Sequence, residues 1–209
     1  MKHQEKISNL IKELKSGKNE KVFKELLKLI KKNPEILDYY FLYEKICAQN
    51  NKLDEAEKVF NFLLTKNKKS LDYLKNLYII CLQKGKLDKA EKYIIELLQV
   101  DNTNYEALRD QGYIKYLQNN LIEAKSIYIK IHNKISKDVF ALNIYALINY
   151  FLGDLDKAIE SLILAIKIDQ NYIDSYNNLG KIYFDQENLE KAFYNFKKAY
   201  KLNKNFSKT

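Results

Sequence analysis

The chain repeats one pattern at a fixed interval of 34 residues. The segment Gly85–Ala90 returns as Asn119–Ala124 and again as Gly153–Ala158, with leucine in the third place and alanine in the sixth. A repeat of this length is one pair of helices joined by a turn, and each pair buries its apolar face only against its neighbours. The period therefore predicts an all-α array of helix–turn–helix hairpins, without a sheet or an inserted domain.

Six repeats align without gaps, at residues 3–36, 37–70, 71–104, 105–138, 139–172 and 173–206. Position 17 of the repeat is leucine in five of the six, and position 20 is alanine in five, with Val22 in the first. Position 24 is large and apolar throughout, from Leu26 to Phe196. We expect one repeat domain over residues 1–209, with helices near 3–16 and 20–32 and at their 34-residue translates.

The predicted turn of each hairpin falls on one position of the repeat. Glycine or asparagine occupies it in five repeats, as Gly17, Asn51, Gly85, Asn119 and Gly153. These are the residues that adopt a left-handed backbone at the lowest cost. The sixth repeat has Glu187 instead, so we expect slight strain in the last turn.

The sixth repeat carries the fullest motif. Its small and large residues fall at helical spacing on two facing helices: Tyr176, Leu179, Gly180, Tyr183, Ala192, Phe196 and Ala199. This pattern resembles the tetratricopeptide repeat, with Tyr176 where tryptophan is usual, and the resemblance covers all six repeats. It implies a right-handed α-solenoid whose first helices line a concave groove for a protein or peptide.

The chain departs from the family pattern in two respects. The proline near the end of the repeat occurs once, as Pro34. The first repeat lacks the first-helix signature, although Ile7, Leu10, Ile11 and Leu14 still form an apolar stripe. We interpret that repeat as an N-terminal cap.

The net charge of +9 comes from 36 lysines and arginines against 27 acidic residues, and Arg109 is the only arginine. Nucleic-acid sites favour arginine for two-pronged contacts to bases and phosphates. We therefore interpret the charge as a solvated lysine surface, and nucleic acid is disfavoured as a partner. The alternative is an RNA-binding helical-repeat protein, whose binding would fall steeply with salt.

The sequence contains no recognisable set of catalytic or metal-binding residues. Its two histidines are His3 and His132, and we expect His132 in the core because its position is apolar in other repeats. Cys47 and Cys81 occupy the same position of neighbouring repeats and are expected to be buried thiols, with a redox pair as the alternative. We expect no enzyme activity, no cofactor and no metal site.

Two absences in the sequence bear on location. It has no run of 18 apolar residues that could span a membrane. Its first residues are polar and lead into an amphipathic segment, unlike a signal peptide. We expect a cytoplasmic protein that does not bind membranes.

In similar repeats, positions 2, 5, 6, 9, 12 and 13 of each first helix line the groove. The fifth repeat is apolar there where its neighbours are polar, and Phe140, Ile144, Leu147 and Phe151 form one stripe whose positions are not expected to pack between repeats. Such a stripe marks a binding surface, although curvature of the array could bury it instead. We predict that nine residues bind the partner: Tyr113, Leu117, Phe140, Asn143, Ile144, Leu147, Phe151, Asn178 and Lys181.

Acidic residues recur at position 2, as Asp38, Asp72, Glu106 and Asp174. They could face basic residues of a partner along one edge of the groove. The alternative is that they stabilise the first turns of their helices through the helix dipole.

The second helix of the last repeat carries Phe193, Phe196 and Tyr200 on the face that packs on a following repeat elsewhere. The sequence stops three residues after the sixth repeat. We expect that a partner, a second copy of this chain or additional residues cover this face. The alternative is screening by the stems of Lys197, Lys198 and Lys201.

Overall fold

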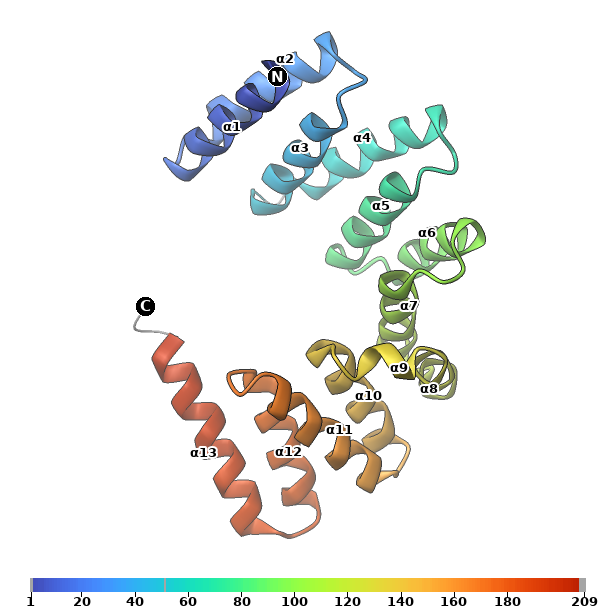
Figure 1. Cartoon of the computed structure of the whole chain (residues 1–209), viewed down its shortest axis with the longest axis vertical. Coiled ribbons are helices and arrows are strands. Elements are labelled where there is room, and N and C mark those ends of the chain that lie inside the picture. Colours follow the sequence, from blue (N-terminus) through green and yellow to red (C-terminus); the bar gives the residue numbers. More distant parts are fainter. Residues whose placement is uncertain (1, 51, 207–209) are drawn as a thin grey trace. The chain divides into compact units, whose positions relative to one another are not determined.

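The structure, a computed structural model, describes residues 2–50 and 52–206. These residues form α-helices joined by short turns and contain no strand (Figure 1). They divide into two compact units, Met1–Glu96 and Leu97–Thr209, called here the N-terminal and C-terminal units. The all-α fold is confirmed, whereas the single domain of six repeats stays a prediction.

The N-terminal unit consists of consecutive helices in antiparallel pairs (Figure 1). The helix α6 begins in this unit and ends in the next. The helices are α1 (Lys2–Lys15), α2 (Asn19–Lys32), α3 (Leu37–Gln49), α4 (Leu53–Lys66), α5 (Leu71–Gln83) and α6 (Leu87–Val100).

The C-terminal unit continues the pattern of helical hairpins (Figure 1). From α4 onward, each second helix begins at the leucine of position 17, as the period predicts. The helices are α7 (Tyr105–Leu117), α8 (Leu121–Lys130), α9 (His132–Ile135), α10 (Val139–Phe151), α11 (Leu155–Ile168), α12 (Ile173–Asp185) and α13 (Leu189–Phe206).

The turns adopt the left-handed backbone that the sequence predicts. Asn51 lies outside the described residues. The remaining predicted turn residues have positive φ angles: Gly17 (81°), Gly85 (67°), Asn119 (60°), Gly153 (82°) and Glu187 (60°). Because its Cβ makes this conformation unfavourable by roughly 1–2 kcal/mol, Glu187 carries a cost that glycine would not.

A backbone hydrogen bond closes each of these turns. At the turn after α5, the N–H of Lys86, three residues beyond the end of the helix, donates to the carbonyl oxygen of Cys81 at 2.8 Å. This is the bond that a left-handed residue makes available, and it satisfies a carbonyl at the helix end. The same bond recurs from Lys18 to Glu13, Asn120 to Lys115, Asp154 to Asn149 and Asn188 to Tyr183.

Two positions of the repeat form the centre of the core. Position 20 is essentially inaccessible to solvent in all six repeats, from Val22 to Ala192. Position 24 is fully buried in the first five repeats, whereas Phe196 in the sixth is 40% exposed. The small residue lets the two helices of a hairpin approach closely, and the large residue fills the space beside it.

The predicted core position of His132 is wrong, because its side chain is exposed. The second helix of this repeat is interrupted: α8 ends at Lys130, and the short helix α9 begins at His132. Ile131 at the break has φ −104° and ψ 13°, outside helical values. The core is instead filled by Ile131 and Ile135, which are both buried.

Cys47 and Cys81 are buried free thiols, as predicted. Burial raises the pKa of Cys47 to about 11, and it raises the pKa of Cys81 as well. Both thiols are therefore protonated and unreactive at neutral pH.

Two glycines show how tightly the hairpins of the C-terminal unit pack. A Cβ atom at Gly112 would lie 2.6 Å from Cε2 of Tyr128, and one at Gly180 would lie 2.9 Å from Cδ1 of Phe196. The two rings differ in freedom to move. Tyr128 is fully buried and its hydroxyl donates to the carbonyl of Arg109 at 3.2 Å, whereas Phe196 reaches solvent.

Gly112→Ala should therefore lower the free energy of unfolding by roughly 1–3 kcal/mol, because the locked ring of Tyr128 cannot give way. Gly180→Ala should be close to neutral, because alanine gains about 1 kcal/mol in helix propensity and Phe196 can turn aside. Urea unfolding of the two variants tests this difference, and equal losses would contradict it.

Candidate functional site

Three first helices of the C-terminal unit lie side by side, with α10 in contact with both α7 and α12 (Figure 1). They carry all nine residues that the sequence predicts for partner binding. Asn104 and Asp138 fix the starts of α7 and α10, since their side chains accept the N–H groups of Ala107 and Ala141 at 3.1 and 3.0 Å.

An aromatic cluster spans α7 and α10. The ring centroids of Tyr113 and Phe140 lie 5.1 Å apart in an edge-to-face arrangement, and Tyr113 stacks on Tyr116 at 6.4 Å. Phe151 lies 6.4 Å from Tyr116 and 5.1 Å from Tyr150. We call these five residues the aromatic face. Each favourable ring pair contributes about 0.5–1.5 kcal/mol beyond burial, so the rings hold one another in place.

A cation lies over the aromatic face at each end. The guanidinium of Arg109 is 5.7 Å from the centroid of Phe140. The ammonium of Lys181, on α12, is 5.1 Å from the centroid of Tyr150 and 5.6 Å from that of Phe151. Because a cation is attracted to the face of a ring, these contacts orient Lys181 over the cluster. The structure thus brings Lys181 and Phe151 together.

Arg109 also joins α7 to the start of α10. It forms ion pairs with Asp110 at 2.8 Å and with Asp138 at 3.2 Å, and the hydroxyl of Tyr105 donates to Asp138 at 3.0 Å. Burial opposes the charge of Arg109, but the hydrogen bonds and charges of the two carboxylates outweigh it and raise its pKa. Burial and the charge of Asp138 also raise the pKa of Tyr105, so this phenol stays a hydrogen-bond donor.

The nine predicted residues differ in how far they reach solvent. Leu117, Phe151 and Lys181 are exposed, whereas Asn143 and Ile144 are buried. The expectation that the apolar stripe is free of packing is therefore wrong for Ile144, which lies in a core cluster. The remaining predicted residues are half-buried: Tyr113, Phe140, Leu147 and Asn178.

Asn143 is buried because it ties α10 to α12. Its side-chain N–H groups donate to the hydroxyl of Ser175 at 2.7 Å and to the carbonyl of Val139 at 3.0 Å. Its carbonyl oxygen accepts from Asn178 at 3.3 Å. A buried amide that is satisfied in this way positions the two helices, and its bonds leave little of the group for a partner.

Sequence reasoning missed three aromatic residues of this surface. Tyr116 and Tyr150 belong to the aromatic face. Phe184 is exposed on α12, three residues after Lys181 in the sequence. All three occupy position 12 of their repeats. Position 12 was among the expected groove positions, so reading it in the fourth, fifth and sixth repeats would have found them.

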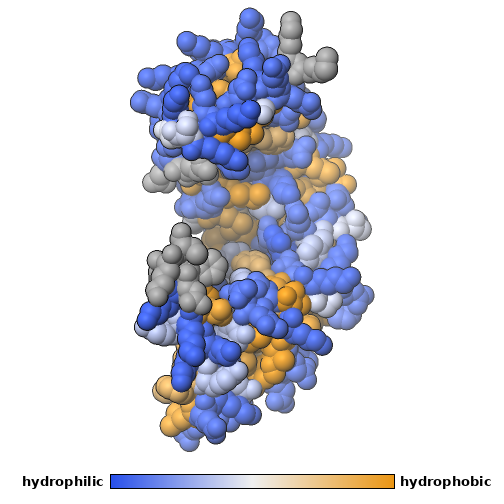
Figure 2. Space-filling view, turned by 60° about the vertical axis from the view of Figure 1, so that its left-hand side comes forward, coloured by the Kyte–Doolittle hydropathy of each residue, from blue (hydrophilic) through white to orange (hydrophobic). Residues whose placement is uncertain are grey.

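The surface is not uniformly polar. On the face that Figure 2 shows, hydrophobic side chains gather in patches within a mostly hydrophilic surface. In the C-terminal unit, large exposed apolar residues on first helices include Leu117, Phe151 and Phe184. Where such residues lie side by side, they usually mark an interaction site.

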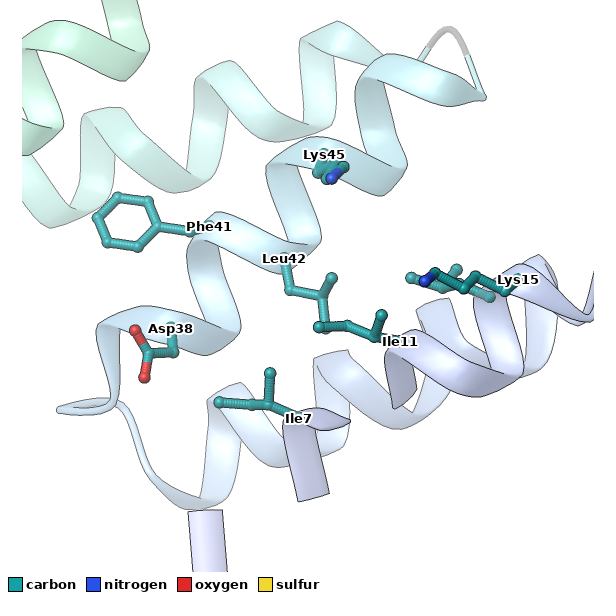
Figure 3. Close-up of a pocket in the computed structure, with 8 residues that line it drawn as sticks. Ile7, Ile11, Lys15, Asp38, Phe41, Leu42 and Lys45 are labelled. Carbon is teal, nitrogen blue, oxygen red and sulfur yellow. The ribbon is translucent and has the colours of Figure 1, made fainter. Parts of the chain in front are cut away.

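The N-terminal unit has a cavity of about 480 Å³ between α1 and α3 (Figure 3). Its apolar wall is made by side chains of both helices, with Asp38 toward one end and Lys15 and Lys45 toward the other (Figure 3). The lining residues are Ile7, Ile11, Leu14, Lys15, Asp38, Phe41, Leu42 and Lys45.

This cavity occupies the groove positions of the first two repeats. The corresponding place between α7 and α10 is filled by rings, because Tyr113 and Tyr116 stand where the first repeat has Ile11 and Leu14. Smaller aliphatic side chains leave the space between α1 and α3 open. The same position of the repeat thus makes an aromatic surface in one unit and an apolar hollow in the other.

The described residues contain neither a cluster of metal-ligating side chains nor a membrane-spanning helix. No group of three or more histidine, cysteine or acidic side chains among them is placed to hold a metal ion. No helix within residues 2–50 or 52–206 is long and apolar enough to cross a membrane.

Two protein-family models match the chain, both within its last third. A TPR repeat model matches residues 147–187, and a tetratricopeptide repeat model matches residues 173–206. No curated protein matches the sequence.

Several solved structures are similar in fold. A crystal structure of MamA is 20% identical, with a TM-score of 0.69, and the match covers 79% of this chain and 97% of MamA. YrrB, described as a TPR protein with an unusual peptide-binding site, is 19% identical over 85% of this chain and 91% of its own, with a TM-score of 0.64. A tetratricopeptide repeat protein from Parabacteroides merdae is 16% identical over 94% and 77%, with a TM-score of 0.74. At these identities the likeness establishes the fold.

Arg109→Lys should lower the free energy of unfolding by roughly 1–2 kcal/mol, because a lysine cannot contact both Asp110 and Asp138 with the fixed fork of a guanidinium. The control is Lys157→Met. Lys157 pairs with Asp154 at 2.8 Å on the exposed surface, so its loss should cost less than about 0.5 kcal/mol. Thermal and urea unfolding measure both, and a neutral Arg109→Lys would contradict the bridging role.

Proposed function

We propose that this chain, a tetratricopeptide-repeat protein by its fold and by the repeats matched at residues 147–206, is a non-catalytic scaffold that binds a segment of another protein. The aromatic face on α7 and α10 carries the proposal. It combines exposed apolar surface with rings and cations that are already held in place. Preorganised aromatic residues are the side chains that most often dominate binding energy at protein interfaces.

The surroundings of the aromatic face indicate the chemistry of the segment. Apolar side chains of the partner would contact Leu117, Phe151 and Phe184, which all reach solvent. A carboxylate of the partner next to those side chains would meet Lys181. Glu106 and Asp174, exposed in the first turns of α7 and α12, would meet basic residues.

The comparison with YrrB supports binding of a peptide, since that protein is described as having a peptide-binding site. In this proposal the interaction takes place in the cytoplasm, the location that the sequence predicts. Partner selectivity would come from the residues at the groove positions, because these vary between repeats while the packing positions do not.

The cavity between α1 and α3 is proposed as a second contact for the same class of partner. Its volume of about 480 Å³ is within the range of ligand pockets, about 300–1,000 Å³, and its walls are mostly aliphatic. It would hold an apolar side chain, with Asp38 at one end and Lys15 and Lys45 at the other to orient neighbouring charges.

Peptides that bind the full chain are first selected from a random display library. Phe151→Ser should lower the affinity for these peptides by about tenfold or more, because it removes the most exposed ring of the aromatic face. The matched control is Ile163→Ser on α11. The two side chains are similarly exposed, at 52% and 50%, but Ile163 lies on a second helix. Fluorescence anisotropy measures both affinities.

Ile163→Ser should change the melting temperature by no more than a few degrees, since its side chain is half in solvent. Phe151→Ser should lower it further, because two ring contacts are lost. Equal affinities of the two variants for every selected peptide would refute the site. Binding that falls steeply with salt and is displaced by RNA would favour the nucleic-acid alternative.

The δ1 methyl groups of Ile7 and Ile11 should shift in methyl NMR spectra when a selected peptide fills the cavity between α1 and α3. The methyl group of Ile122, which is strongly exposed on α8, serves as the internal control and should stay unchanged. If no selected peptide shifts the NMR signal of the Ile7 or Ile11 methyl group, the cavity is not a binding site.

A further inference from the structure

The last second helix, α13, exposes a face whose counterpart on α11 is packed. The two helices can be compared position by position, since they belong to consecutive repeats. At positions 17, 21, 24 and 28, α11 has Leu155, Ile159, Leu162 and Ile166, and α13 has Leu189, Phe193, Phe196 and Tyr200. We call the second set the α13 stripe.

On α11 these four residues pack against the next first helix. Leu162 is fully buried in a cluster that includes Leu179 and Ile182 of α12, and Leu155, Ile159 and Ile166 pack around that cluster. Tyr183 of α12 joins them. The cover of α11 is therefore an α-helix that presents apolar residues at spacings of three and four.

On α13 the same positions face solvent. Leu189, Phe193, Phe196 and Tyr200 are 64, 67, 40 and 66% exposed. Their spacing of four, three and four residues places them along one side of the helix. An adjacent side of α13 is packed, because Ala192, Asn195 and Ala199 are buried.

Lys197 borders the α13 stripe but does not cover it. The ammonium of Lys197 lies 5.5 Å from the centroid of Phe193, a ring that nevertheless remains 67% exposed. The sequence of α13 contains five lysines and one glutamate. Screening by lysine stems thus leaves the rings available and gives the surface a positive border.

We propose that the α13 stripe is the docking site for an acidic amphipathic α-helix of another protein, which would lie on α13 as α12 lies on α11. The apolar side of that helix would carry residues like Leu179, Ile182 and Tyr183. Its flanks would carry carboxylates, which pair with the lysines of α13 and are attracted to them before contact.

A second copy of this chain is a poorer occupant on grounds of charge. Pairing two α13 helices about a two-fold axis would bring their lysines together. Covering α13 with α1 of another copy would add Lys6, Lys12 and Lys15, which are exposed on that helix. With a net charge of +9 on each chain, like charges oppose both arrangements.

The test uses two synthetic helical peptides and the full chain. Both peptides carry leucine, isoleucine and tyrosine at the spacing of Leu179, Ile182 and Tyr183, and they differ only in having glutamates or lysines on the flanks. Fluorescence anisotropy should show saturable binding of the glutamate peptide that weakens with added salt. The lysine peptide should bind at least about tenfold more weakly.

Variants of the chain locate the binding. Phe193→Ser and Tyr200→Ser should each weaken binding of the glutamate peptide about tenfold, whereas Tyr194→Ser, an exposed ring of α13 outside the stripe, should leave it unchanged. Phe151→Ser should also leave it unchanged, which separates this surface from the aromatic face. Circular dichroism checks that α13 still folds in each variant.

Three results would overturn the proposal. One is equal affinity for the two peptides, and another is binding that survives Phe193→Ser. The third is a dimer of the full chain, seen by light scattering after size exclusion, that dissociates with Phe193→Glu, because the occupant would then be a second copy.

Discussion

The close approach of two helices within each hairpin is the constraint on which the rest of this structure depends. It requires a small residue at position 20, where Val22 and five alanines are all buried, and a large one at position 24. Where glycine allows still closer contact, the ring of Tyr128 or Phe196 lies against it. Each repeat is folded by these few contacts and by its neighbours, so the remaining positions are free to differ.

That freedom explains why equivalent surfaces of the two units have different chemistry. Ile11 and Leu14 leave a hollow beside α3, whereas Tyr113 and Tyr116 at the same positions build a stacked surface beside α10. The backbone is the same hairpin in both cases. What the side chains change is the shape of the surface and the charges around it, which is the property that a scaffold uses to distinguish partners.

Most of the fold could be predicted, because a 34-residue period places the helices and the turns of the described residues, including the left-handed turn at Glu187. The site could be predicted only in part. Periodicity does not show how far each first helix is rotated about its own axis. Asn143 and Ile144 were therefore expected at the surface, but both side chains are buried. It also cannot show a local break such as the one at Ile131, which turns His132 outward.

The helices α11 and α13 have different residues at equivalent positions, and the difference follows whether those positions are covered. Leu155, Ile159, Leu162 and Ile166 are aliphatic and are covered by the next first helix. At the same positions α13 keeps one leucine and has two phenylalanines and a tyrosine, with Lys197 beside Phe193. Aromatic residues retain a large contact area with few rotatable bonds, and the tyrosine hydroxyl tolerates water. The change from aliphatic to aromatic residues therefore suits a surface that must exist both free and bound.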